Sequence, residues 1–320
     1  MNPDVPKPSV LALGAFPPGM LTTMGEQFTL HYFTDFPLPH DALLPEVAAG
    51  IRGLATEANR GAPRDLIDRL PNLEIISTFG VGVDAVDIPA ARARGIALTN
   101  TPGVIADDVA DLAIGLMIAA AREIVAADSY AREGRWTAKT SYGLARSVTG
   151  KRLGIIGLGA IGNAVAERAC GFRMKIAYSD VEPKSSVPYS YVADPVELAR
   201  NSDFLVVACF GGPSTRHLVS AEVIEALGAK GTLINIARGS IVDEGAMIDA
   251  LKSGRLGAAG LDVFENEPDI PAELLAMPNV VLQPHVGTAT TETRELMGRM
   301  VIDNLAAKFA GKPLPNELSA

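Results

Sequence analysis

The sequence has few cysteines and no long uncharged apolar run. Cys170 and Cys209 are the only cysteines among 320 residues, so neither a disulfide framework nor a CxxC metal site is predicted. Two isolated cysteines favour a reducing compartment such as the cytoplasm. The most apolar run, 112–121, is well short of the roughly 18 residues that a membrane span needs. Residues 1–8 contain no basic region before an apolar core, so no secretory signal is expected.

Positive charge is also scarce. The chain has 28 Lys and Arg against 37 Asp and Glu, a net charge of −9, and no basic run. Nucleic acid and anionic membranes are therefore not expected partners, and an anionic ligand needs a local set of donors.

The length favours two domains, because a typical domain has about 150 residues. Apolar residues make up 48% of the chain, with 31 Gly and 22 Pro, which excludes a disordered, collagenous or coiled-coil protein.

Short apolar runs rich in β-branched residues alternate with helical patterns, which indicates α/β units around parallel sheets. A first series of strands is predicted at 9–13, 28–33, 51–56, 74–78 and 96–100. A second series is predicted at 152–156, 175–178, 204–207, 232–236, 258–261 and 280–282. Helical patterns cover 41–48, 63–70, 88–94, 105–132 and 291–310, and others separate the strands of the second series. The sequence therefore predicts two α/β sheets, the second beginning near residue 151.

A glycine-rich turn opens the second series. Gly157, Gly159 and Gly162 form a GxGxxG pattern directly after an apolar strand and directly before a helical pattern. The glycines allow a tight turn and close approach of the backbone to a pyrophosphate, and the helix N-terminus attracts the anion. The alternative is that these glycines only allow a helix to pack closely on a strand. The strand before the turn and the helix after it favour a dinucleotide site instead.

Asp180 follows the next strand, about 20 residues beyond the turn. An acid at this place in the fingerprint hydrogen-bonds the ribose hydroxyls of NAD. A carboxylate would repel the 2′-phosphate of NADP, and Val181 and Glu182 provide no arginine to bind it. The sequence therefore favours NADH over NADPH.

Three charged side chains follow strands of the second series: Arg238, Glu267 and His285. Reduction of a ketone needs a proton donor near the carbonyl oxygen, which histidine supplies near neutral pH. Arginine can bind a carboxylate bidentately, and a carboxylate beside histidine favours the imidazolium. The alternative is a structural Arg238–Glu267 ion pair beside an ordinary loop histidine. Of the other histidines, His31 and His40 are expected at the surface.

At these residues the sequence resembles the D-isomer-specific 2-hydroxyacid dehydrogenases, near the glyoxylate/hydroxypyruvate and hydroxyphenylpyruvate reductase branch. The resemblance covers about residues 54–313. The motifs that carry it are 77–84, 99–102, 107–111, 157–162, 235–239, 260–268 and 284–287.

The resemblance implies roles for particular residues. His285 would be the general acid/base, Glu267 would pair with it, and Arg238 would bind the carboxylate and keto oxygen of the substrate. Backbone groups of Val81 and Gly82 would also hold the carboxylate. The remaining residues implied as cofactor contacts are Ala160, Ile161, Asp180, Ala237, Asp262 and Gly287, and no metal is implied.

The resemblance also implies two Rossmann-like or flavodoxin-like domains with a cleft between them. A substrate-binding domain would comprise residues 1–100 and 290–320, and a dinucleotide domain residues 101–289. Homodimers are usual in the family, with an arm at 105–146. The even distribution of apolar residues over 112–121 would suit burial at that contact.

The expected function is NAD(P)H-dependent reduction of a small 2-oxo acid, hydroxypyruvate or glyoxylate first and an arylpyruvate second. One alternative is an NAD(H)-sensing binding protein of the same fold, since such relatives keep the Arg, Glu and His. Another is an alanine dehydrogenase-like or homocysteine hydrolase-like enzyme, which lacks this spacing. Glu267 also argues against formate dehydrogenases, which have glutamine there. Phe210 stands where many relatives have proline, next to the nicotinamide-side loop.

Overall fold

The computed structural model describes residues 6–39 and 41–318. The chain folds as two units, each with its own sheet. Unit 1 consists of the residues up to Ile105 together with those from Ala289 onward, and unit 2 spans Ala106–Thr288. In the described part of the chain, no helix is long and apolar enough to cross a membrane. His40 lies outside the described residues, and His31 is half-buried on a strand.

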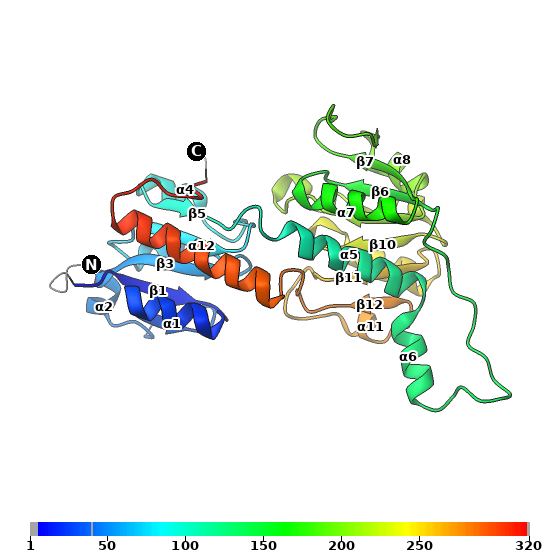
Figure 1. The fold of residues 1–320 in the computed structure, drawn as a ribbon, viewed down its shortest axis with the longest axis horizontal. Coiled ribbons are helices and arrows are strands. Elements are labelled where there is room, and N and C mark those ends of the chain that lie inside the picture. The colour runs from blue at the N-terminus through cyan, green and yellow to red at the C-terminus, as the bar shows by residue number, and fades with distance from the viewer. Residues whose placement is uncertain (1–5, 40, 319–320) are drawn as a thin grey trace. The chain divides into compact units, whose positions relative to one another are not determined.

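Unit 1 contains a five-stranded parallel sheet (Figure 1). The strand order is β2-β1-β3-β4-β5, which is the flavodoxin-like order. The strands are β1 (Ser9–Leu13), β2 (Thr29–Phe33), β3 (Ile51–Glu57), β4 (Ile75–Phe79) and β5 (Ala97–Thr99). Every residue of β4 is buried, as is usual for a parallel strand that is covered on both faces.

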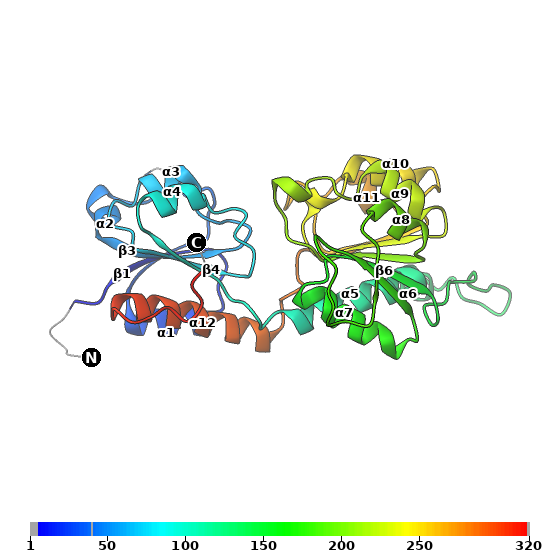
Figure 2. The same ribbon diagram turned by 90° about the horizontal axis from the view of Figure 1, so that it is seen from above.

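The helices of unit 1 lie on the two faces of this sheet. Figure 2 shows α1 and α12 on one face and α2, α3 and α4 on the other. The bounds are α1 (Pro18–Gln27), α2 (Pro45–Gly50), α3 (Arg64–Asp68), α4 (Ile88–Ala93) and α12 (Thr291–Phe309). Caps define two of the helix starts, because Asp87 accepts a hydrogen bond from Ala90 N and Thr290 accepts one from Thr293 N. The last helix of the chain therefore packs on the sheet that the first third of the chain forms.

Unit 2 contains a seven-stranded parallel sheet in the order β12-β11-β10-β9-β6-β7-β8. The strands are β6 (Arg152–Ile156), β7 (Lys175–Ser179), β8 (Ser190–Tyr191), β9 (Phe204–Val207), β10 (Thr232–Asn235), β11 (Ala258–Leu261) and β12 (Val280–Leu282). Read from β8, the order is that of a dinucleotide-binding Rossmann sheet with one further strand. The strand order reverses between β6 and β9. The two parallel sheets confirm the fold class that the sequence predicts.

Helices cover both faces of the second sheet as well. Figure 2 shows α5 and α7 on one face and α8 to α11 on the other. The helices are α5 (Ala106–Ala121), α6 (Ile124–Arg132), α7 (Ala160–Gly171), α8 (Pro195–Arg200), α9 (Ala221–Leu227), α10 (Glu244–Lys252) and α11 (Ala272–Leu275). Two 3-10 turns occupy Pro213–Thr215 and Gly239–Ile241. Each unit has its own buried apolar cluster, so each sheet is stabilised by its own core.

Three predictions about the elements were wrong or incomplete. The single helix expected over 105–132 is two helices, because Glu123 has a left-handed φ of 53° between α5 and α6. Arg146 N donates to Ala121 O and so satisfies a carbonyl at the end of α5. The sequence analysis missed α1, whose Pro-Gly start and internal Gly25 have poor helix propensity. It also missed β8, which has only two residues.

The apolar run 112–121 packs within its own unit. Ala113, Leu116, Met117 and Ala120 are buried, and α5 lies against α7, β10 and β11. Leu116 contacts the position of Gly260, where an added Cβ would lie 3.0 Å from the Leu116 Cβ. The apolar residues of this run suggested burial at a contact between subunits. The ones named here are instead buried in the core of unit 2.

Candidate active site

The glycine turn between β6 and α7 is built from close backbone contacts. Gly157 has a φ of 89°, and a Cβ there would lie 2.6 Å from the backbone of Cys209. A Cβ on Gly162 would lie 2.1 Å from Gly157 O. Gly159, in contrast, is exposed, is the N-cap of α7 and has open space where a Cβ would stand. This position can accept a phosphate at the N-terminus of α7, so the turn fits a dinucleotide pyrophosphate.

Cys209 lies against this turn at the end of β9, where the strand order reverses. Burial raises the pKa of its thiol to about 11, so the sulfur is uncharged at neutral pH. The side of the turn that faces β9 therefore adds no negative charge. This suits an anion-binding turn in an acidic protein.

Asp180 lies at the end of β7, beside the glycine turn. Its Oδ2 accepts a hydrogen bond from Leu158 N at 3.0 Å, and its Oδ1 accepts one from Val181 N at 2.7 Å. Lys184 Nζ is 3.3 Å from Asp180 Oδ2. Partial burial acts to raise the pKa of Asp180, but the two amides and the Lys184 ammonium lower it overall. The carboxylate is thus ionised and fixed at the turn, and the sequence analysis missed the lysine beside it.

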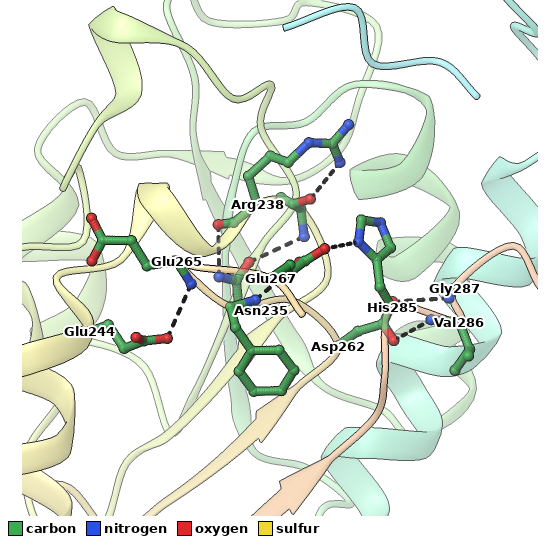
Figure 3. A network of polar contacts seen from close by, with 11 residues as sticks. Asn235, Arg238, Glu244, Asp262, Glu265, Glu267, His285, Val286 and Gly287 are labelled. Carbon is green, nitrogen blue, oxygen red and sulfur yellow. Dashed lines mark hydrogen bonds and ion pairs between the residues drawn. The ribbon is translucent and has the colours of Figure 1, made fainter. Parts of the chain in front are cut away.

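The structure brings Glu267 and His285 together. They follow β11 and β12, while Arg238 follows β10, so the three residues extend from neighbouring strands (Figure 3). His285 Nδ1 lies 2.6 Å from Glu267 Oε2, and the other carboxylate oxygen accepts a hydrogen bond from Phe264 N at 3.1 Å. The bond to Glu267 fixes the orientation of the imidazole and leaves Nε2 as the nitrogen for a substrate.

Asp262 holds the backbone around His285. Its carboxylate accepts hydrogen bonds from Val286 N at 2.7 Å and Gly287 N at 2.9 Å, and its carbonyl accepts one from His285 N. His285 has a left-handed φ of 53°, which is unfavourable for a residue other than glycine. Burial raises the pKa of Asp262, although the two amides and the charge of His285 oppose this. Asp262 therefore stabilises the strained turn that presents the imidazole.

Arg238 is held by its own loop. Asn235 Nδ2 donates to Arg238 O at 2.9 Å, and Arg238 Nη1 donates to Ala237 O at 2.8 Å. A Cβ at Gly211 would lie 2.6 Å from Arg238 Cγ, so only glycine leaves room for the stem of this side chain. The loop after β9 and the loop after β10 therefore fit together around the arginine.

The loops that carry Arg238 and Glu267 are in direct backbone contact. A Cβ at Gly239 would lie 1.9 Å from Phe264 C, so the two loops could not approach with any other residue there. Glu244, at the start of α10, accepts a hydrogen bond from Glu265 N at 3.2 Å (Figure 3). Burial raises the pKa of Glu244. Gly239 belongs to the motif 235–239, but its contact with Phe264 and the part played by Glu244 were not predicted, because nothing in the sequence shows that these loops meet.

A second charged pair borders the same loop. Glu265 Oε1 lies 2.8 Å from Arg216 Nη2 and 3.3 Å from His217 Nε2. The sequence analysis gave His217 no role, and the structure places it on Glu265 rather than on Glu267. The two acids of this loop therefore have different histidine partners.

The other predicted residues lie at the start of α7 and in loops that follow strands of the two sheets. Ala160 and Ile161 begin α7, and Ala237 N donates to Asn235 Oδ1 at 3.1 Å. In unit 1, Val81 and Gly82 follow β4. Asn100 Nδ2 donates to Val81 O at 2.8 Å, so the carbonyl of this turn is held from β5. The turn thus has a defined backbone conformation.

Comparison with known proteins identifies the family. Residues 114–287 match the model of the D-isomer specific 2-hydroxyacid dehydrogenase, NAD binding domain. The chain is 50% identical over 291 residues to hydroxyphenylpyruvate reductase of Plectranthus scutellarioides, covering 91% of this chain and 92% of the relative.

Two solved structures are similar over nearly the whole chain. One is a 2-hydroxyacid dehydrogenase from Ketogulonicigenium vulgare Y25, with 48% identity, a TM-score of 0.91 and coverage of 98% and 99% of the two chains. The other is the NADPH-dependent glyoxylate/hydroxypyruvate reductase of Sinorhizobium meliloti in complex with NADP and malonate, with 40% identity, a TM-score of 0.90 and coverage of 98% and 97%.

The family model, the identities and the fold agree with the family that the sequence motifs suggested. The dinucleotide fingerprint and the family model also support an oxidoreductase that binds NAD(P) rather than a protein of an unrelated class. The chain belongs to the NAD(P)-dependent D-isomer-specific 2-hydroxyacid dehydrogenase family, in its reductase branch.

Proposed function

We propose that this protein reduces a small 2-oxo acid to the D-2-hydroxy acid, with hydroxypyruvate or glyoxylate as the first candidates and an arylpyruvate as the second. The observation that carries the proposal is the 2.6 Å contact between His285 and Glu267. These two residues follow β12 and β11, and Arg238 follows β10, the strand next to β11. The names of the relatives support these substrates, since they include a hydroxyphenylpyruvate reductase and a glyoxylate/hydroxypyruvate reductase.

The chemistry divides between the ligand and the chain. When bound, the reduced nicotinamide supplies a hydride to the keto carbon. Arg238 binds the carboxylate and keto oxygen of the substrate and so stabilises the negative charge that develops on that oxygen. His285 gives the proton on Nε2 to the oxygen, which completes the hydroxyl group. Glu267 orients the imidazole through Nδ1 and stabilises its protonated form.

The two units have separate tasks in this proposal. Unit 2 holds the dinucleotide at Gly157–Gly162, with Asp180 at the ribose, and Ala160, Ile161, Ala237, Asp262 and Gly287 are the further residues proposed around it. Backbone groups of Val81 and Gly82 in unit 1 contact the substrate carboxylate. The Asp180 carboxylate favours NADH, because it accepts hydrogen bonds from ribose hydroxyls and repels a 2′-phosphate.

The segment around α6 supports a homodimer. None of the side chains of α6 is buried, and the helix and the following loop extend from the sheet of unit 2 (Figure 1). Exposed apolar side chains occur along it at Ile124, Val125, Trp136 and Leu144, the last fully exposed. Such a group of side chains is typical of an interface.

The two free cysteines support a cytoplasmic location.

The test is a panel of 2-oxo acids with each cofactor. Glyoxylate, hydroxypyruvate, pyruvate, phenylpyruvate and hydroxyphenylpyruvate are each mixed with NADH or NADPH, and the loss of absorbance of the reduced cofactor is followed. Turnover of at least one acid supports the reductase, and the ratios of kcat/KM rank the substrates. Cofactor binding without turnover of any acid would favour an NAD(H)-sensing protein instead.

A further inference from the structure

A lysine stands beside the acid that the dinucleotide fingerprint places at the ribose. Lys184 Nζ lies 3.3 Å from Asp180 Oδ2, and the two side chains keep 36% and 20% of their exposure. Both groups therefore reach solvent. A ligand at this position meets a carboxylate and an ammonium together, and the pair has no net charge.

Hydrogen bonds in the surrounding loop fix the backbone position of Lys184. Tyr178 Oη accepts a hydrogen bond from Lys184 N at 2.6 Å, and Tyr191 Oη donates to Asp180 O at 3.2 Å. Tyr178 is fully buried, and its ring packs against that of Tyr191 at 5.5 Å between centroids. Two tyrosines of neighbouring strands thus anchor both ends of the segment 180–184. The ammonium is held near Asp180 by this anchoring as well as by charge.

The pair is placed at the glycine turn as well. Asp180 Oδ2, the oxygen nearest to Lys184, also accepts the hydrogen bond from Leu158 N between Gly157 and Gly159. In a dinucleotide fold, an acid at this place contacts the 2′-hydroxyl of NAD, while a cation nearby accommodates the 2′-phosphate of NADP. This chain has both kinds of group, 3.3 Å apart.

We propose that Lys184 determines cofactor specificity by binding the 2′-phosphate of NADPH, so that the protein uses both dinucleotides and Asp180 alone does not exclude NADPH. The proposal rests on the proposed function, since it assumes a dinucleotide at this turn. Lysine is a common phosphate ligand, acting as a compact charge with three donors. A 2′-phosphate that displaces the Asp180 carboxylate from the ammonium exchanges one anionic partner for another.

The test measures binding without any chemistry. Isothermal titration calorimetry gives the Kd for ADP-ribose and for 2′-phospho-ADP-ribose, and the selectivity ratio is the second Kd divided by the first. Lys184→Gln removes the charge, and we expect the ratio to rise about tenfold because a charge-assisted hydrogen bond is lost. Lys184→Arg keeps the charge and keeps the ratio near the value of the unchanged protein.

A matched control separates this local effect from net charge. Lys175 is exposed at the first residue of β7, at the other end of the strand that Asp180 follows. Lys175→Gln changes the net charge of the protein by the same amount as Lys184→Gln. We expect it to leave the selectivity ratio unchanged.

A second background tests whether the lysine contacts the phosphate itself. Asp180→Asn removes the repulsive charge and keeps an oxygen for Leu158 N, so the selectivity ratio falls. If Lys184 binds the phosphate, adding Lys184→Gln to Asp180→Asn raises the ratio again. If the lysine only neutralises Asp180, the added substitution has no effect, and the proposal is wrong.

Two further outcomes would also overturn it. The first is an equal loss of affinity for both ligands in Lys184→Gln, which would make Lys184 a purely structural partner of Asp180. The second is a selectivity ratio that does not change in Lys184→Gln while ADP-ribose binds normally. Failure of the proposed function is distinguishable, because it would appear as no turnover in the panel of 2-oxo acids, whereas the calorimetry measures only binding at the dinucleotide turn.

Discussion

The two proposed ligand-binding regions of unit 2 are built in different ways. The turn after β6 is formed by backbone, with three glycines and a helix N-terminus, and the side chains of Asp180 and Asn163 hydrogen-bond to that backbone. The group after β10, β11 and β12 is formed by charged side chains that hydrogen bonds hold in place. The first region suits an anion that must be held, and the second suits a reaction in which a proton moves. Substitutions should therefore affect dinucleotide binding in the first region and use of the oxo acid in the second.

The largest effect is expected at His285. In His285→Gln the proton donor is lost, and kcat should fall by roughly 10² to 10⁴, the usual contribution of general acid catalysis. Calorimetry should show nearly unchanged NADH binding, because the glycine turn is intact. A variant with near-normal kcat would remove His285 from its proposed role, and weak NADH binding would break the separation between the two regions.

The glycines of the turn should differ among themselves. In Gly162→Ala the added Cβ lies 2.1 Å from Gly157 O, so the turn must open, and we expect a loss of about 2–4 kcal/mol in the free energy of unfolding. Gly159→Ala has open space for the Cβ and serves as the matched control. It should fold normally and lose about tenfold in NADH affinity, because the methyl group stands where a pyrophosphate approaches.

Thermal denaturation and NADH titration of both glycine variants check this prediction. Equal stability of the two variants would contradict the close contact at Gly162. A Gly159→Ala variant with unchanged NADH affinity would contradict the placement of the pyrophosphate at the start of α7.

Arg238 tests whether geometry or charge holds the substrate. Arg238→Lys keeps the positive charge but loses the planar fork, so KM for the oxo acid should rise about tenfold to a hundredfold while NADH affinity changes little. Arg238→Ala should abolish use of the oxo acid. Steady-state kinetics with glyoxylate or hydroxypyruvate provide the measurement, and an unchanged KM in Arg238→Lys would show that bidentate binding is not required.

The smallest effect is expected at Glu244 and concerns stability against pH. Burial raises the pKa of this carboxyl in the folded protein, so its charge costs stability at neutral pH, and the cost disappears as the pH falls through that raised pKa. Glu244→Gln keeps an oxygen for Glu265 N and removes the charge. Its unfolding free energy should exceed that of the unchanged protein by up to about 1 kcal/mol at pH 7, and the difference should shrink on acidification.

Denaturant titrations of both proteins at several pH values follow this difference. If the Glu244→Gln advantage grew as the pH fell, the sign of the shift would be wrong. If kcat also fell strongly, Glu244 would be needed to position the loop of Glu267 and not only to stabilise it.

Features that depend on local order were predictable from sequence. Apart from the two-residue β8, the strands of both sheets were placed to within a residue or two, because buried parallel strands are continuous apolar runs. The helix break at Glu123 was not predicted, since a partner from residue 146 satisfies the end of α5. Lys184 was not predicted to lie beside Asp180, because the residues directly after Asp180 are not basic and the lysine comes four positions later.

The sequence alone determined the α/β class, the glycine turn with its acid, and the three charged residues after consecutive strands. These follow from periodicity and from residues that lie close together along the chain. The structure was needed to show that Glu267 contacts His285, a pairing that the resemblance only implied, and that Gly239 lies against the Phe264 backbone. The reason is physical: which loops meet depends on the order of strands in the sheet, and that order brings together residues far apart in the chain.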